Sequence, residues 1–123
     1  MTDQSPSLPR LGVCVGTVVL QGDRALLVRQ GEGHDLAGRW SIPWGMVETN
    51  EWPEVAALRE TQEEGGIQAE IEGLLGLQNL PAEGWIALLF LCRHVGGTPE
   101  PDGMETDRAA YFSLVELDAL AEA

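Results

Sequence analysis

Positive charge is scarce in this 123-residue chain, which contains seven arginines and no lysine against twenty aspartates and glutamates. The formal net charge of −13 opposes binding to duplex nucleic acid, which needs a basic protein surface. It also opposes adsorption to anionic membranes. No apolar run approaches the roughly 18 residues that a membrane-spanning helix needs. The expected partner is therefore a small molecule, with no duplex nucleic acid and no membrane, while a homodimer stays open.

Cysteine is also rare, and Cys14 and Cys92 both lie in apolar, strand-like segments. Two buried, reduced cysteines are typical of a cytoplasmic protein. Residues 1–10 are polar and lack the basic and apolar regions of a secretory signal, so we expect a flexible arm and a cytoplasmic location. Residues 11–123 are enough for one domain around a single core.

The hydrophobic pattern predicts an α/β fold. Valine-rich residues 11–20 and residues 24–29 flank a Gln-Gly-Asp turn and predict a β-hairpin. Pro53 suits a first helical turn, and Gly65-Gly66 a helix end. Further strands are predicted at 67–80, 85–95 and 109–112, and a closing helix at 114–121. Strands on both sides of a helix favour a mixed β-sheet between helices.

The helix that begins at Pro53 carries two finer predictions. Trp52 is a poor N-cap, so Asn50 or Thr49 is expected to cap the first turn. Helical periodicity separates an apolar side, expected to pack on the sheet, from an acidic side, expected to face a cleft. The apolar side consists of Val55, Leu58 and Gln62, and the acidic side consists of Glu60, Glu63 and Glu64.

The acidic side of this helix is the most informative pattern in the chain. Its three glutamates follow i, i+3, i+4 spacing and share one helix face. Like charges so placed repel by roughly 0.2–0.5 kcal/mol per pair even on an exposed helix. Mg²⁺ takes oxygen ligands, and a tight carboxylate cluster supplies them. The spacing therefore indicates a divalent metal site.

Eight residues around these glutamates match the Nudix box, G-(five)-E-(seven)-R-E-U-x-E-E-x-G-U, where U is a bulky aliphatic residue. They are Gly45, Glu51, Arg59, Glu60, Glu63, Glu64, Gly66 and Ile67. Thr61 departs from the pattern, since an aliphatic residue is usual there. The chain from about Leu11 to Leu120 thus resembles one Nudix (MutT-like) domain, which implies an α/β/α sandwich with a mixed β-sheet.

The resemblance also implies a function, Mg²⁺-dependent hydrolysis of a nucleoside diphosphate linked to a group X, with Mn²⁺ as a possible substitute. A backbone carbonyl of Trp44 or Gly45 is expected to join the side-chain metal ligands. Glu51 and Arg59 resemble the pair that ties the preceding loop to the helix. The metal ligands implied by the resemblance are Glu60, Glu63 and Glu64.

The resemblance leaves open which carboxylate activates the attacking water. Glu60 and Glu63 belong to the box, while Glu105 is the best candidate outside it, with Asp107 two residues further along. Glu48 can reach a metal through water. For Glu105 and Glu48, a purely solubilising role is an equal alternative.

Three residues are candidate substrate contacts. Arg29 and Arg39 can hold a phosphate by charge-assisted hydrogen bonds, with surface ion pairs as the alternative. Trp44 stands where the family usually has glycine, and its ring can stack on a nucleobase for roughly 0.5–1.5 kcal/mol beyond burial. Packing against the protein is the alternative for Trp44, and likewise for Trp52.

A second function remains as an alternative, a catalytically silent Nudix-fold module that binds or senses nucleotides. Complete retention of the box carboxylates favours the hydrolase. Which diphosphate derivative is cleaved, and with how many metal ions, has no simple sequence code.

Overall fold

Apolar segments separated by turns become seven strands and two helices in the computed structural model, which describes residues 10–33 and 36–122. The strands are β1 (Gly12–Gln21), β2 (Arg24–Gln30), β3 (Trp40–Ser41), β4 (Trp44–Met46), β5 (Ile67–Leu80), β6 (Trp85–Gly97) and β7 (Thr106–Phe112). The helices are α1 (Pro53–Gly65) and α2 (Leu114–Glu122). Apart from Arg10, the arm predicted for residues 1–10 lies outside the described residues. Within those residues, neither helix combines the length and apolarity that a membrane crossing requires.

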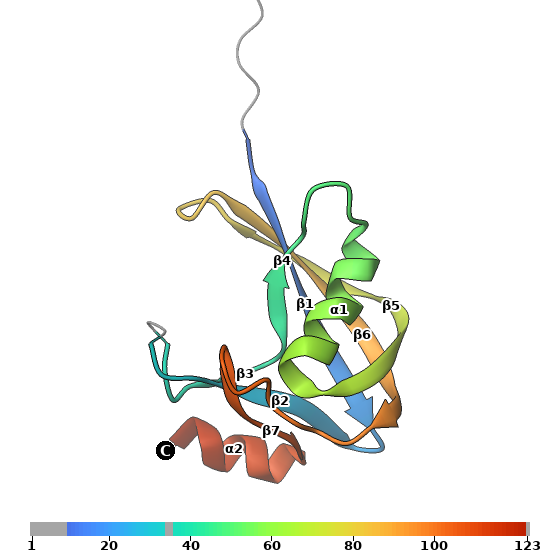
Figure 1. Cartoon of the computed structure of the whole chain (residues 1–123), viewed down its shortest axis with the longest axis vertical. Coiled ribbons are helices and arrows are strands. Elements are labelled where there is room, and N and C mark those ends of the chain that lie inside the picture. Colours follow the sequence, from blue (N-terminus) through green and yellow to red (C-terminus); the bar gives the residue numbers. More distant parts are fainter. Residues whose placement is uncertain (1–9, 34–35, 123) are drawn as a thin grey trace, which may run out of the picture.

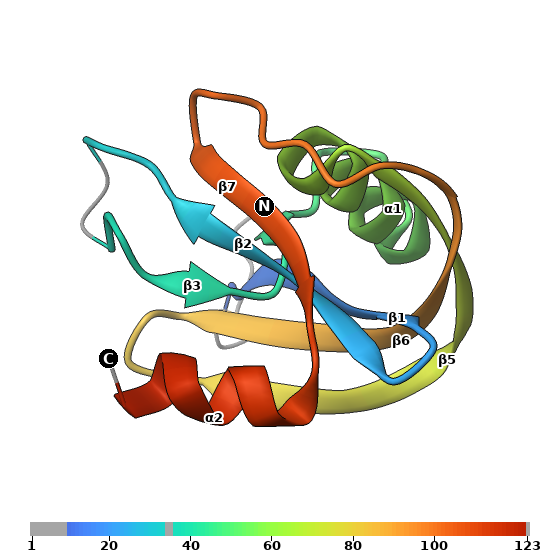
Figure 2. The same cartoon turned by 90° about the horizontal axis from the view of Figure 1, so that it is seen from below.

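The sheet is mixed, as predicted. Strands β1 and β6 run parallel, from Gly12 opposite Trp85 to Leu20 opposite Arg93, and the other pairs are antiparallel. The strand order is β3-β2-β1-β6-β5, with β4 added to β1 and β7 added to β2. Helix α1 packs across the sheet (Figure 1), and α2 lies on its opposite side (Figure 2). The predicted α/β/α arrangement is therefore confirmed.

Strands β6 and β7 extend beyond their predicted bounds by two residues or more. Strand β7 begins at Thr106 instead of Ala109, because Thr106 pairs with Gln30 across a β-bulge. Strand β6 continues to Gly97, which pairs with Ile67 at the start of β5. Register with a neighbouring strand, which local propensity does not report, sets both boundaries.

The N-terminal cap predicted for α1 is wrong. The N-cap residue is Trp52, which makes no side-chain capping bond. Asn50 lies two residues earlier in a left-handed turn with φ of 64° and does not cap the helix. The predicted end is confirmed, because Gly66 adopts φ of 73° and its N–H donates to the carbonyl of Gln62 at 2.9 Å. Glycine is favoured in this left-handed conformation.

The predicted faces of α1 are also wrong. Val55 is 53% exposed and Gln62 is exposed. Small buried residues of α1, such as Gly65 against Leu26 of β2, let the helix axis approach the sheet closely. On the acidic side, Glu60 and Glu64 are buried beside β4 and the loop before β7, whereas Glu63 is exposed. The buried residues of α1 are Ala56, Ala57, Glu60, Thr61, Glu64 and Gly65.

One apolar core lies between α1 and the sheet. It joins β1, β2, the start of β5 and β6 to the two helix alanines. Cys14 and Cys92 are both buried and free, as expected. The core side chains are Val15, Val19, Leu26, Ala56, Ala57, Ile67, Phe90 and Cys92.

Thr61, which departs from the box, contacts Thr17 of β1. Both side chains are fully buried, and their hydroxyl oxygens lie 2.6 Å apart. The Thr61 hydroxyl also lies 2.8 Å from the carbonyl of Ala57, to which it can donate. The pair explains the polar residue, because each hydroxyl satisfies the other inside the core.

Thr61→Val is expected to lower the free energy of unfolding by about 1–3 kcal/mol, because it leaves the buried Thr17 hydroxyl without a partner. The double variant Thr17→Val/Thr61→Val removes both polar groups, so its loss should be smaller than the sum of the two single losses. Urea denaturation of the four proteins measures the difference. Strict additivity would show that this hydrogen bond is energetically silent.

Candidate metal centre

Strand β4 places its backbone, which has no side chain at Gly45, against the acidic side of α1. The Trp44 N–H donates to Glu64 Oε2 at 3.0 Å. A Cβ atom at Gly45 would overlap the Glu60 carboxyl group and lie 2.6 Å from its Cγ. Glycine at this position is therefore required for the Glu60 carboxylate to lie where it does.

Three carboxylates from two distant segments converge beside β4. One oxygen each from Glu60, Glu64 and Glu105 lies within 4.8 Å of the others. Glu60 and Glu64 are buried, whereas Glu105 is exposed. The sequence predicted the two helix residues as ligands and Glu105 as a candidate base, and the structure brings all three together.

Three hydrogen bonds, each accepted by a main-chain carbonyl, place the loop that carries Glu105. The Glu100 N–H donates to the carbonyl of Gly65 at 2.8 Å, and the Thr106 hydroxyl donates to the carbonyl of Glu64 at 2.9 Å. On the other side, Gly31 N–H donates to the Glu105 carbonyl at 2.8 Å. The loop is thus attached to the last turn of α1 and to the end of β2.

Arg59 organises the other side of the acidic cluster. Its Nε and Nη2 donate to the two carboxylate oxygens of Glu51, at 2.8 and 3.0 Å. Its Nη1 donates to Glu60 at 2.8 Å, and its Nη2 to the Met46 carbonyl at 3.2 Å. The arginine thereby links the loop before α1 to the helix and to β4, in the position expected for an orienting pair with Glu51.

Glu63 lies outside the group of three carboxylates. Its side chain is 54% exposed and accepts a hydrogen bond from Arg59 Nη1 at 3.3 Å. Glu48 is more exposed and lies 3.7 Å from Arg59. Both sit at the edge of the cluster, bound to the same guanidinium.

Burial makes the inner carboxylates hard to ionise without a counter-charge. Burial, and then the nearby Glu60, raise the pKa of Glu64 to about 8, although the Trp44 N–H opposes this. Burial also raises the pKa of Glu60, against hydrogen bonding by Arg59. A cation would offset both effects, and the all-oxygen donor set suits a hard divalent ion. The residues present therefore fit Mg²⁺ or Mn²⁺.

The metal-free protein is expected to lose stability as the pH rises from 4.5 to 8. Glu64 titrates at about 8 when folded, against an ordinary value of 4.5. In that window the folded state holds a proton that the unfolded state has lost, so raising the pH favours unfolding, by up to about 1.4 kcal/mol per pH unit. Denaturation in EDTA at pH 5 and pH 8 measures this. Glu64→Gln should flatten the dependence, and an unchanged slope in that variant would contradict it.

The predicted substrate contacts have different surroundings. Arg29 donates from Nε and Nη2 to the two carboxylate oxygens of Asp107, at 2.7 and 2.9 Å, while Arg39 is exposed. The Trp44 ring lies 6.2 Å from that of Trp85, whereas Trp52 is 73% exposed. Trp44 also lines an apolar cavity of about 250 Å³, together with Cys14, Gly16, Ile42, Trp85 and Leu89.

Sequence reasoning missed a second cavity, which contains Trp40, Arg108 and Phe112. Each of these residues looks ordinary by itself, and only the pairing of β2 with β3 and β7 brings them together. To predict this cavity, the sequence would have had to indicate the register in which three separate segments pair.

Comparison with known proteins agrees with this architecture. A family model described as the NUDIX domain matches residues 10–123. A MutT-like protein of Streptomyces ambofaciens is 32% identical over 94% of this chain and 80% of its own length. An ADP-ribose pyrophosphatase of Methanocaldococcus jannaschii is 28% identical over 84% of this chain and 63% of its own length. This chain spans 27% and 41% of two further curated relatives.

A solved structure shows the same arrangement of strands and helices. A NUDIX hydrolase of Nitrosomonas europaea aligns with a TM-score of 0.82 at 27% identity. The alignment covers 89% of this chain and 61% of that protein.

Proposed function

Since this chain belongs to the Nudix hydrolase family, we propose that it cleaves the phosphoanhydride bond of a nucleoside diphosphate linked to a group X. Water attacks phosphorus and releases a nucleoside monophosphate and a phosphorylated X. The observation that carries this proposal is the convergence of Glu60, Glu64 and Glu105 within 4.8 Å.

Mg²⁺ is the proposed cofactor, with Mn²⁺ as a substitute, held by Glu60, Glu64 and Glu105. When bound, such a cation supplies charge neutralisation for the diphosphate and acidifies a coordinated water. The chain needs that counter-charge, because its own net charge of −13 repels an anionic substrate. Arg59 keeps Glu60 in place while Trp44 N–H does the same for Glu64.

Glu63 and Glu105 are the proposed alternatives for the base that accepts a proton from the attacking water. Both are exposed, so a proton accepted there has a direct path to solvent. Glu63 is also proposed to complete the ligand set by rotating away from Arg59. Its hydrogen bond to Arg59, at 3.3 Å, is the longest that this arginine makes to a carboxylate.

The organic part of the substrate is proposed to occupy the apolar cavity beside Trp44. Trp44 connects the two regions, because its N–H holds Glu64 and its side chain lines the cavity. A cavity with almost no polar lining selects a flat aromatic group by shape and stacking, not by hydrogen bonds. ADP-ribose and other adenine-containing diphosphates are therefore the first substrates to test, in line with the name of one relative.

A cytoplasmic location is proposed on separate grounds. Cys14 and Cys92 are both buried free thiols. Reduced cysteines are usual in the cytoplasm.

A substrate panel tests the proposed function. Purified protein with Mg²⁺ is incubated with ADP-ribose, dinucleoside polyphosphates, nucleotide sugars and damaged nucleoside triphosphates, and the products are identified by mass. Release of a nucleoside monophosphate that stops in EDTA supports the hydrolase. Tight nucleotide binding by calorimetry with no turnover of any compound would replace it with the silent module.

A further inference from the structure

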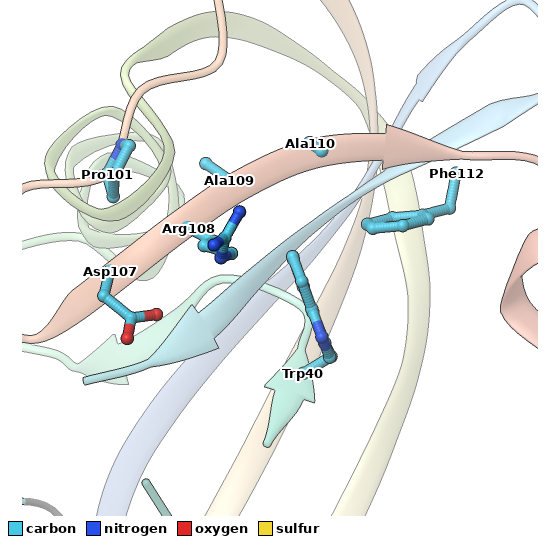
Figure 3. A pocket seen from close by; sticks show the side chains of 7 residues that line it. All are labelled: Trp40, Pro101, Asp107, Arg108, Ala109, Ala110 and Phe112. Atoms are coloured by element: carbon cyan, nitrogen blue, oxygen red, sulfur yellow. The ribbon is translucent and has the colours of Figure 1, made fainter. Parts of the chain in front are cut away.

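A second cavity, of about 470 Å³, lies over β3 and β7 (Figure 3). Its labelled side chains gather along β7, with Trp40 on β3 across from them. Arg108 and Asp107 supply charge, Trp40 and Phe112 supply aromatic surface, and Ala110 supplies a small floor. The volume is in the range of small-ligand sites.

This cavity is on the side of the sheet that faces away from α1. Val28 and its partner Ala109 point toward α1, since Val28 is fully buried and adjoins Gly65 at the helix end. The next pair, Arg29 opposite Arg108, must point the other way, because side chains alternate along a strand. The carboxylate cluster and this cavity are therefore on opposite faces.

The charges in the cavity are arranged unfavourably for a protein without a ligand. Arg29 and Arg108 are direct cross-strand partners, and like charges so placed destabilise a sheet. Asp107 accepts hydrogen bonds from Nε and Nη2 of Arg29, one on each carboxylate oxygen. For Arg108, the described part of the chain offers no hydrogen bond or ion pair. Arg108 is thus an exposed cation whose neighbouring carboxylate, Asp107, is already hydrogen-bonded to Arg29, and an anion in the cavity would give it a partner of its own.

An aromatic corner stands beside this cation. The rings of Trp40 and Phe112 meet edge to face, with centroids 5.0 Å apart and planes at 78°. Both are partly buried, so the corner is held in place while one surface stays open to the cavity. A planar base can pack against such a corner whatever its hydrogen-bonding pattern.

We propose that this cavity is a second ligand site, separate from the carboxylate cluster, which binds a nucleoside monophosphate with its base against Trp40 and Phe112 and its phosphate on Arg108. Arginine donates paired hydrogen bonds to phosphate oxygens, and the small side chain of Ala110 on the floor leaves room for the sugar. The site requires no metal, because its cation is a side chain.

The test is calorimetric titration with AMP in EDTA, which suppresses binding at the carboxylate cluster. Wild-type protein should bind AMP, and Arg108→Gln should weaken binding at least about tenfold, since it removes the charge that holds the phosphate. Arg93→Gln is the matched control: it removes the same charge from an exposed arginine paired with Glu70 on another strand, and should leave the affinity unchanged.

Two further titrations identify what is recognised. Adenosine and inorganic phosphate should each bind at least about tenfold more weakly than AMP, since each engages half of the site. No AMP binding in EDTA, or a Kd that Arg108→Gln leaves unchanged, overturns the proposal. So does loss of AMP binding in Glu60→Gln with Arg108→Gln unaffected, because the ligand would then occupy the carboxylate cluster. Turnover with Mg²⁺ is measured separately, so failure here is distinguishable from failure of the proposed hydrolase.

Discussion

Replacement of Glu64 by Gln is expected to reduce phosphoanhydride hydrolysis by roughly 10²–10⁴-fold, the rate equivalent of several kcal/mol of charge stabilisation. The side chain is almost fully buried and keeps its shape on substitution, so the change removes a charge and little else. The same substitution should raise the stability of the metal-free protein at pH 8, by about 1–3 kcal/mol, because burial opposes ionisation there. A stability gain paired with loss of activity separates a functional carboxylate from a structural one.

The measurements are kcat with Mg²⁺ and the denaturation midpoint in EDTA. Glu54→Gln is the matched control, since it removes an exposed carboxylate from the same helix and should change neither quantity appreciably. Glu63→Gln extends the comparison: a loss of activity without a stability gain would fit an exposed base or outer ligand. Full activity in Glu64→Gln would remove this residue from the proposed site.

Gly45→Ala is expected to reduce hydrolysis by about 10²-fold while changing the free energy of unfolding by only about 1 kcal/mol. The added methyl group would occupy the space of the Glu60 carboxyl group, which must rotate away. The Glu60 carboxyl group is the end of a flexible side chain, so it can move without disturbing the fold. The carboxylate cluster is disrupted, because the displaced Glu60 carboxylate leaves the group of three.

Activity and isothermal Mn²⁺ titration of Gly45→Ala test this account, with weaker metal binding expected alongside the lost activity. Gly76→Ala provides the control, because a Cβ at Gly76 would meet nothing within 4 Å. If Gly45→Ala bound Mn²⁺ as tightly as the original protein, close approach of this backbone to Glu60 would be irrelevant to the site.

The order of the five longer strands and the two helices could be predicted because local sequence determines it, whereas the short strands β3 and β4 were not predicted. Valine-rich segments, the turn after Gln21 and the glycines after α1 each act within a few residues. The mixed sheet followed from that order, and the Nudix box added the fold family. The buried face of α1 could not be predicted, since it depends on how close the helix lies to β4 and β2.

The candidate site was likewise predictable only in part. Helical spacing correctly placed Glu60 and Glu64 side by side, and the resemblance pointed to Glu105. Spacing alone suggested that Glu63 points with them, but Arg59 holds that side chain at the solvent edge. The cavity with Arg108 left no local trace, because it forms only when β3 and β7 pair with β2.

The attachment of the 98–105 loop has a consequence for how related enzymes can diversify. The main-chain carbonyls of Glu64 and Gly65 fix this loop, and any amino acid supplies such an acceptor. Between these anchors the Asp102 carboxylate also holds the loop, because it accepts from the N–H groups of Met104 and Thr106 at 2.7 and 2.9 Å. The remaining side chains of the loop can vary without removing any of these bonds. Substitutions in this segment can therefore change substrate specificity while the positions of the reactive carboxylates stay the same.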